Sequence, residues 1–216
     1  MSLNISVVVP TLNAAAFLPA TLAALGEVPE VIVVDGGSID ASVAIAAARG
    51  ARVITAPRGR GSQIAAGVAA AGHPWLLLLH ADTRLSPGWQ QAVHGSPAQA
   101  GYFRFVLDSD DPRARRLERL VAWRCRTFGL PYGDQGLLIH RDLLQAVGGI
   151  NAMPLMEDVD LVRRIGNRRL LPLDASAVTS ARRWEQAGYI RRSARNLLCL
   201  SLWFAGTPPS VIRRIY

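Results

Sequence analysis

The sequence predicts an α/β fold in which a mixed, mostly parallel central sheet is flanked by helices. Over the first eighty residues, short apolar strands alternate with alanine- and leucine-rich helical segments, a pattern typical of a parallel sheet. Residues 75–79 (WLLLL) are apolar throughout, as expected of a strand buried on both faces. In the second half, two strands are separated by an arginine-rich helix, which indicates that the sheet is mixed.

Residues 5–79 are expected to form three strand–helix units followed by a fourth strand. β-Branched residues dominate the strand segments and alanine dominates the helical ones, in line with their preferences. Gly50 is expected to end the second helix. The expected strands are residues 5–9, 31–34, 52–55 and 75–79, and the expected helices are residues 14–25, 40–49 and 61–71.

The second half is expected to add longer helices to the same domain, since no linker, repeat or low-complexity tract interrupts the 216 residues. The expected strands are residues 102–107 and 136–140, with short extended segments at 170–173 and 177–179. The expected helices are residues 113–127, 157–165 and 188–204.

The charge is carried in an unusual way. All 24 basic residues are arginines, and the formal net charge is +8. Guanidinium groups bind phosphate and carboxylate groups, although a codon bias of the source would equally explain the missing lysines. Cys125 and Cys199 lie far apart, so we expect neither a disulfide framework nor a cysteine zinc site. We expect no nucleic-acid partner.

The two ends of the sequence bear on its location. An apolar strand follows Met1 almost directly, without a basic segment or a cleavage site, so we expect no secretory signal and a cytoplasmic protein. The apolar stretch Leu197–Gly206 has about half of the ~20 residues that a transmembrane helix needs. It either packs on the domain or contacts an anionic membrane surface weakly. The arginines that flank it are Arg191, Arg192, Arg195, Arg213 and Arg214.

Four loops that follow the first four strands carry polar residues. In an open α/β sheet, ligands bind beyond the carboxyl ends of the strands, so these loops are expected to line one cleft. Their acids and their glycine-rich basic turn suit a nucleoside, a diphosphate and a divalent cation. The loops are residues 10–13, 35–40, 58–63 and 80–83.

Some of these polar residues have a structural alternative. Asn13, Asp35, Ser38 and Asp40 all precede or begin helical segments, where such side chains cap the free backbone N–H groups. Two other nucleotide motifs are absent. The first strand–helix turn contains no glycine, which excludes a dinucleotide-binding fingerprint, and no P-loop sequence occurs.

The ordered segments VVVPTLN, VVDGGSID, APRGRGSQIAAG, LLLLHADT, YGDQG, MEDVDL and SARRW resemble family 2 glycosyltransferases over nearly the whole chain. The resemblance is closest to a small bacterial subgroup associated with arsenosugar biosynthesis. It implies a GT-A fold, a nucleoside-diphosphate sugar as donor, and Mg²⁺ or Mn²⁺ as cofactor. It also implies a division into a nucleotide-binding half (1–83), an acceptor and catalytic half (84–184) and a C-terminal helical extension (185–216).

The resemblance assigns roles to three acids. Asp35 would contact the nucleotide base, Asp82 would bind the metal at the end of a DxD motif, and Asp158 would be the general base beside Glu157. His80 replaces the first acid of DxD. Its imidazole is either a second metal ligand, a hydrogen-bonding partner of the sugar, or only the end of the strand. Without the other motifs, Glu157 and Asp158 would be an acidic first helical turn.

The remaining site residues follow from the same resemblance. The GDQ segment is an acceptor loop or a bare turn, and the late Arg-Arg-Trp element closes over the substrates or is a solvated turn. The implied donor residues are Pro10, Thr11, Asn13, Asp35, Gly37, Arg58, Gly61, Gln63, His80, Ala81 and Asp82. The implied acceptor residues are Gly133, Asp134, Gln135, Arg182, Arg183 and Trp184.

The function that the resemblance implies is an inverting transfer of a sugar to a hydroxyl acceptor, with the aspartate taking the proton. The acceptor itself is not identified by the sequence. Two alternatives remain: a sugar-phosphate nucleotidyltransferase, and an inactive nucleotide-binding protein at the membrane periphery. Pyrophosphate release from a nucleoside triphosphate and a sugar phosphate distinguishes the first alternative, and the absence of donor hydrolysis distinguishes the second.

Overall fold

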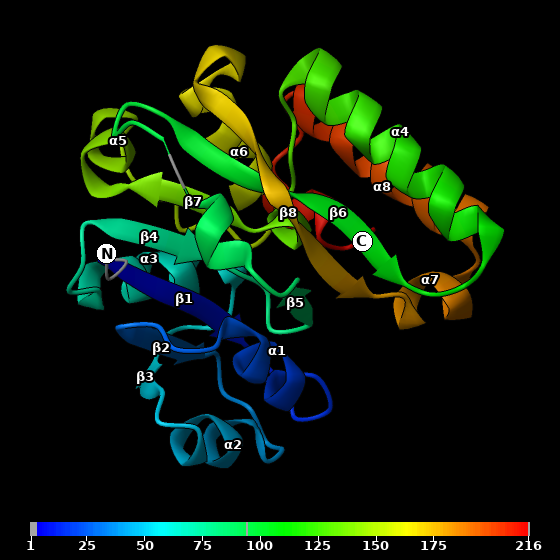
Figure 1. Ribbon diagram of the computed structural model, residues 1–216. Helices are drawn as coiled ribbons and strands as arrows, with labels where there is room; N and C mark the ends of the chain where they lie inside the picture. Colours follow the sequence, from blue (N-terminus) through cyan, green and yellow to red (C-terminus); the bar gives the residue numbers. More distant parts are fainter. Residues whose placement is uncertain (1–3, 94, 216) are drawn as a thin grey trace.

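A single curled sheet forms the centre of the computed structural model, which describes residues 4–93 and 95–215 (Figure 1). Within these residues the sheet has eight strands in the order β3-β2-β1-β4-β7-β6-β8-β5. The predicted mixed, mostly parallel α/β fold is confirmed. The strands are β1 (Ile5–Thr11), β2 (Glu30–Asp35), β3 (Arg52–Thr55), β4 (Trp75–Leu78), β5 (Thr83–Leu85), β6 (Ala100–Asp108), β7 (Leu137–His140) and β8 (Leu170–Ser180).

The direction of the strands changes in the middle of the sheet. β1 pairs in parallel with β2 and β4, and β2 pairs in parallel with β3. β7 then pairs antiparallel with both β4 and β6, whereas β6 and β8 are parallel and β5 closes the edge antiparallel to β8. The contact between β4 and β7 therefore joins the two halves of the chain.

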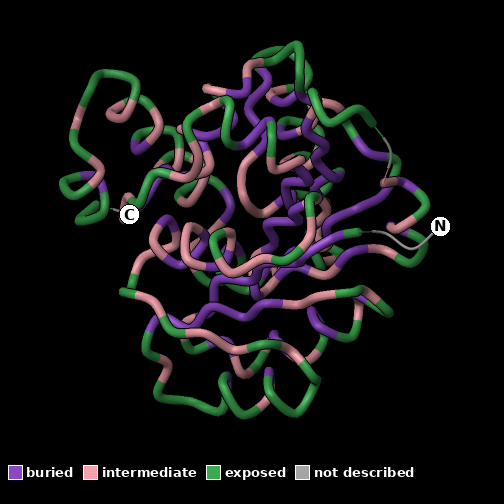
Figure 2. Tube along the Cα trace, turned by 90° about the vertical axis from the view of Figure 1, so that its left-hand side faces the viewer, coloured by how far each residue is buried: buried purple, intermediate pink, exposed green. Residues whose placement is uncertain are grey.

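Helices cover both faces of the sheet, and the alternation of side chains along β1 shows which helices lie on which face. Val8 packs in the cluster that includes residues of α3, α4, α5 and α6, whereas Val7 and Val9 pack with α1, α2 and η1. The buried strands between exposed helices are visible in Figure 2. The helices are α1 (Leu18–Leu25), α2 (Ser42–Ala48), α3 (Arg60–Ala70), α4 (Pro112–Phe128), α5 (Arg141–Ala146), α6 (Glu157–Ile165), α7 (Arg182–Ala187), α8 (Tyr189–Phe204) and α9 (Pro209–Ile212), with 3₁₀ turns η1 (Trp89–Ala92), η2 (Gly133–Gln135) and η3 (Asn167–Arg169).

Several predicted boundaries are wrong for local reasons. α1 begins at Leu18, with Pro19 in its first turn, and not at residue 14. α2 begins at Ser42 and not at residue 40, because Asp40 accepts a hydrogen bond from the backbone N–H of Ser42 at 3.0 Å. The two short extended segments form one strand, β8, in which Pro172 is accommodated near a shift in the register with β6.

The C-terminal residues do not form a separate layer. α8 and α9 pack Cys199 and Ile212 against Leu155, Met156 and Val159 at the start of α6. α8 also lies beside α4 (Figure 1). No helix in residues 4–93 and 95–215 is long and apolar enough to cross a membrane. Residues 1–3 and 216, at the ends of the predicted nucleotide-binding half and helical extension, and residue 94 in the predicted acceptor half lie outside the described residues.

Candidate active site

Three of the four expected loops meet in one open hollow, which we term the strand-end pocket, at the carboxyl ends of β1 and β4. The loops after β1, β3 and β4 line it, together with the segment before α6. The loop after β2 is not among its lining. The lining residues are Pro10, Thr11, Leu12, Asn13, Ala14, Phe17, Arg58, Gly59, Arg60, Gln63, His80, Ala81, Asp82, Pro154, Leu155, Arg183 and Arg213.

The loop after β2 is held by its own polar side chains. Asp35 is buried, and its carboxylate accepts hydrogen bonds from the backbone N–H groups of Gly37 at 2.9 Å and Ser38 at 3.0 Å. Gly37 has a φ of 93°, which favours glycine. Asn13 accepts from the N–H of Ile39 at 2.9 Å and thereby connects the β2 loop to the β1 loop. It does not cap α1, whose N-cap is Phe17.

Gln63 fixes the ends of β1 and β2 beneath the strand-end pocket. Its side-chain amide is buried and donates to the carbonyl oxygens of Thr11 at 2.8 Å and Val34 at 2.7 Å. These bonds tie the ends of β1 and β2 together. Gln63 lines the strand-end pocket, but both N–H groups of its amide are already engaged.

The glycine-rich turn at the start of α3 brings two arginine side chains to the strand-end pocket. Arg58 and Arg60 flank Gly59, and no side chain caps the N-terminus of α3. Gly61 is not in the lining. A Cβ at Gly61 would lie 2.6 Å from the carbonyl oxygens of Asn151 and Met153, so this glycine permits the segment before α6 to approach α3. That segment carries Leu155 to the pocket wall.

Two acids of the second half enter a neighbouring hollow, which we term the central pocket. It brings His80 and Asp82 from the end of β4 together with Asp134 and Asp158. His80 and Asp82 line both hollows, so the two are continuous there. The other lining residues are Arg60, Tyr132, Leu155, Met156, Val159, Thr179, Ser180, Arg183, Trp184, Arg192, Asn196 and Leu200.

His80 is held against the backbone of η2. A Cβ at Gly133 would lie only 2.5 Å from its Nε2 atom, so glycine is required for this approach. Burial lowers the pKa of His80 to about 4, assisted by the charge of Arg60 and opposed by Asp82 and Asp158. The imidazole is therefore neutral near pH 7, and one of its ring nitrogens has a lone pair for a ligand.

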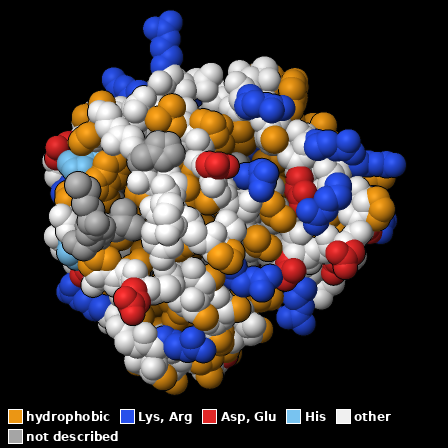
Figure 3. Space-filling view, viewed as in Figure 1, with side chains coloured by type: hydrophobic (Ala, Val, Ile, Leu, Met, Phe, Trp, Pro, Cys, Tyr) orange, Lys and Arg blue, Asp and Glu red, His pale blue; other side chains and the backbone are white. Residues whose placement is uncertain are grey.

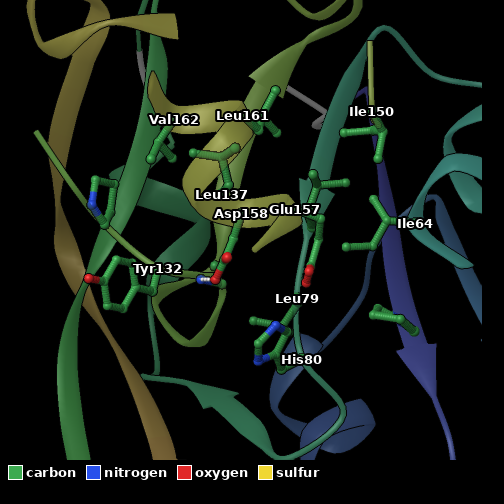
Figure 4. Close-up of a pocket in the computed structure, with 15 residues that line it drawn as sticks. Ile64, Leu79, His80, Tyr132, Leu137, Ile150, Glu157, Asp158, Leu161 and Val162 are labelled. Atoms are coloured by element: carbon green, nitrogen blue, oxygen red, sulfur yellow. Dashed lines mark hydrogen bonds between the residues drawn. The ribbon is translucent and has the colours of Figure 1, made fainter. Parts of the chain in front are cut away.

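Asp158 and Glu157 begin α6 but have different surroundings. Asp158 accepts from the N–H of Gly133 at 2.8 Å and from its neighbour Val159 at 2.8 Å. Glu157 is 3% exposed, and its Oε1 lies 2.9 Å from Nε of Arg60. Burial raises the pKa of Glu157 in spite of that arginine. Figure 4 shows both acids and His80 beside an otherwise apolar cavity lined by Ile64, Leu79, Leu137, Ile150, Leu161 and Val162.

Asp134 and Gln135, in η2, differ in how far their polar atoms are satisfied. Gln135 is buried, donates to the carbonyl oxygen of Phe103 at 3.1 Å, and accepts from the N–H of Tyr132 at 3.2 Å. It has a structural role in the turn. Asp134 Oδ1 is buried and has no hydrogen-bond partner among the described residues. Burial raises the pKa of Asp134 from 3.8 to about 6.

The residues of the Arg-Arg-Trp element, 182–184, lie partly at the site and partly in the protein interior. Arg183 lines both hollows. The guanidinium of Arg182 lies over the ring of Phe17 at 5.5 Å, and Trp184 is buried beneath Arg192 at 5.1 Å. The sequence analysis did not assign Arg192 or Asn196 to the site. Their spacing of four residues on α8 places both on one helix face, which was the available signal.

The donor set for a divalent cation is small. Among the residues that the structure describes, no group of three or more His, Cys, Asp and Glu side chains is arranged to hold a metal ion. Asp82 and the neutral His80 offer one oxygen and one nitrogen ligand. A cation such as Mg²⁺ is commonly held by one or two protein ligands together with substrate phosphates, so these residues fit a metal that arrives with a diphosphate.

Residues 6–96 match the family model described as Glycosyl transferase family 2. Uncharacterized glycosyltransferases of Mycobacterium tuberculosis and Mycobacterium bovis are 36% identical over 138 residues, which is 60% of this chain and 63% of theirs. The chain thus matches less than two thirds of the length of these relatives. The resemblance to the arsenosugar subgroup stays a prediction.

Solved structures show the fold. Glucosyl-3-phosphoglycerate synthase from M. tuberculosis, in complex with phosphoglyceric acid, is 20% identical with a TM-score of 0.55, over 82% of this chain and 70% of that protein. Its complex with Mn²⁺, uridine diphosphate and glucosyl-3-phosphoglycerate gives a TM-score of 0.55 at 21% identity over the same shares. The predicted GT-A type fold is therefore confirmed.

Proposed function

We propose that this protein is a family 2 glycosyltransferase that moves a sugar from a nucleoside diphosphate to a hydroxyl group, with inversion at the anomeric carbon. The observation that carries the proposal is the meeting of His80, Asp82, Asp134 and Asp158 in one pocket that adjoins an arginine-lined hollow at the strand ends. The family match over residues 6–96 supports it. We further propose a cytoplasmic location.

The donor is proposed to be a uridine-diphosphate sugar, because a protein of the same fold binds uridine diphosphate with Mn²⁺. The diphosphate would lie near Arg58, Arg60 and the N-terminus of α3, which attracts anions. Asp35 holds the backbone of its own loop. That loop is hydrogen-bonded to Asn13, so the nucleoside would contact it through the segment Thr11–Asn13. Base recognition by Asp35 remains part of the proposal.

Asp82 and His80 would hold the cation, which when bound neutralises the charge of the leaving diphosphate. Asp158 would take the proton of the acceptor hydroxyl. The N–H groups of Gly133 and Val159 fix the orientation of its carboxylate, so that it needs no rearrangement during the reaction. Arg183, between the two hollows, would contact phosphate oxygens.

The first prediction concerns donor binding. Uridine diphosphate should bind with Mn²⁺ and lose most of its affinity in EDTA, because a carboxylate beside two phosphates repels them unless a cation lies between. Asp82→Asn should reduce the affinity in Mn²⁺ at least tenfold, about 1.4 kcal/mol. Calorimetric titration measures both effects, with the exposed Asp174→Asn as the control. Equal affinity in EDTA and Mn²⁺ would remove the metal from the proposal.

The second prediction separates the proton acceptor from the binding residues. Asp158→Asn should keep its affinity for uridine diphosphate and lose ~10²–10⁴-fold in kcat, the usual contribution of a general base. An asparagine keeps an oxygen that can accept from Gly133, so the fold should persist. Transfer is measured as release of uridine diphosphate in the presence of an acceptor. If the rate of Asp158→Asn equals that of the wild type while Asp134→Asn is inactive, Asp134 is the base.

A further inference from the structure

A long apolar groove separates α4 from α8, outside the pockets described above. Leu120, Trp123 and Phe128 of α4 and Leu197, Leu200 and Phe204 of α8 form its walls. The groove encloses about 1440 Å³, including space open to solvent. The two helices that border it run side by side along one edge of the molecule (Figure 1).

Large apolar side chains of this groove are exposed to water. Leu120 is 62% exposed, Trp123 is 53% exposed and Leu197 is 64% exposed. Scattered exposed apolar residues are normal on a protein surface, whereas a contiguous set along a groove marks a binding surface. The groove is therefore expected to be covered by an apolar ligand when the protein functions.

The groove runs into the central pocket. Tyr132, Asp134, Trp184, Asn196 and Leu200 line both. At this junction, Asp134 Oδ1 and Asn196 Oδ1 are buried and have no hydrogen-bond partner among the residues that the structure describes. Both atoms are acceptors, and buried acceptors without a donor are costly. A ligand that reaches the junction should therefore present hydroxyl groups to them.

We propose that the acceptor of the sugar is an amphiphile, with an aliphatic chain in the α4–α8 groove and a hydroxylated head at the junction. The proposal rests on the proposed glycosyltransferase function and names its acceptor class. The chain supplies binding energy by leaving water. Asp134 and Asn196 accept from hydroxyl groups of the head, and this places another hydroxyl in the pocket that contains Asp158.

A partner helix or a second copy of the protein fits the observations less well. Either could cover the apolar walls, but apolar contacts alone would leave the oxygens of Asp134 and Asn196 without partners. The continuity of the groove with the central pocket instead favours one molecule that occupies both.

The test uses 1-O-decylglycerol, below the concentration at which it forms micelles, and glycerol, which has the same head without the chain. Decylglycerol should bind the wild-type protein in the presence of Mn²⁺ and uridine diphosphate, and glycerol at equal concentration should not. Leu197→Gln should weaken the binding of decylglycerol at least tenfold. The matched control is Leu198→Gln, because Leu198 is 50% exposed on the same helix but does not line the groove.

The outcomes separate this proposal from the function on which it rests. If uridine diphosphate with Mn²⁺ does not bind, the glycosyltransferase function fails. If it binds equally well to the wild type and both leucine variants, but decylglycerol binds no better than glycerol, the acceptor class is wrong. Equal losses of affinity for decylglycerol in Leu197→Gln and Leu198→Gln would also overturn the proposed acceptor class. So would a dimer, seen by light scattering, that only Leu197→Gln dissociates, since the groove would then be an interface between copies.

Discussion

His80 is the residue at which this chain departs from the expected DxD motif, and its environment determines what it can offer to a ligand. Because burial and Arg60 keep the imidazole neutral, the residue offers a nitrogen lone pair and adds no charge. Under the proposed function, Asp82 would be the anionic protein ligand of the cation and His80 a neutral one. A softer nitrogen ligand favours Mn²⁺ over Mg²⁺ relative to an all-oxygen site.

Asp134 leads to the third prediction, on pH. Its pKa is raised from 3.8 to about 6 by burial, so its charged form opposes folding above about pH 6. That penalty is relieved as the pH falls from 6 to 3.8, because the folded state takes up the proton first. Asp134→Asn lacks the penalty. Its Tm relative to the wild type should therefore be highest above pH 7 and should decline toward pH 4.

Thermal denaturation in EDTA, without nucleotide, measures this difference across the pH range. The control is Asp174→Asn, whose side chain is exposed, and its Tm difference from the wild type should be constant. If the Tm difference between Asp134→Asn and the wild type does not change between pH 4 and 7, the pKa of Asp134 is not raised by burial.

At the level of single residues, the sequence predicted where polar side chains gather but not what each one contacts. Asp35 and Asn13 were expected either to bind the donor or to cap helices. The structure shows them bonded to neighbouring loop backbone. The same oxygen atoms serve both purposes, so residue type alone cannot separate them. Gln135 was expected at the acceptor site, and only its tertiary contacts reveal that it is buried in the turn.

The helix α3 packs closely on the sheet at Gly67. A Cβ at Gly67 would lie 2.3 Å from Cγ1 of Val8 and 2.9 Å from Cγ2 of Val34. Both valines are fully buried and have few alternative rotamers. Because α3 also carries Arg60 into the site, its distance from the sheet determines the position of that guanidinium.

The fourth prediction follows from this packing. Gly67→Ala should destabilise the protein by roughly 1–3 kcal/mol, the usual cost of overpacking a core, although alanine is the better helix former. The control is Gly72→Ala, where the added Cβ would have its nearest neighbour at 3.6 Å. Thermal denaturation compares the two variants. A Gly67→Ala protein as stable as the wild type would show that α3 can move away from the sheet at little cost.

Elements with a strong periodic pattern were predicted well, and short or interrupted ones were not. The first four strands and α4, α6 and α8 occur close to their expected positions. β5 has only three residues, too few for an alternating pattern to be recognised. β8 was divided by Pro172 and Asp174 in the sequence, but its pairing with β6 on both sides of the register shift keeps it one strand.

For the molecule as a whole, the positive charge has a spatial distribution that the sequence could not give. Arginine side chains are spread over the face shown in Figure 3, with fewer acidic side chains among them. The groove between α4 and α8 was also not foreseen, because it joins segments about sixty residues apart in the chain. Periodicity within one helix indicates an apolar side but does not indicate whether another helix covers it.

The fifth prediction concerns membrane surfaces. The arginines near the C-terminus and the exposed side chains of α8, such as Ile190 at 85% and Leu198 at 50%, should give weak adhesion to vesicles that contain anionic lipid. About 0.5 M salt should abolish it, since screening then acts over only a few ångströms. Co-sedimentation measures the bound fraction, with neutral vesicles as the control. Tight binding that survives the salt would mean that α8 inserts into the lipid.

The antiparallel contact between β4 and β7 joins a half that carries Asp82 to a half that carries Asp134 and Asp158. Natural selection can therefore act on the two halves separately. Under the proposed function, changes in the second half would alter the acceptor while the first half kept the same nucleotide, provided that the pairing of β4 with β7 is preserved. A lineage of enzymes with this function would then diversify its products without a change of donor.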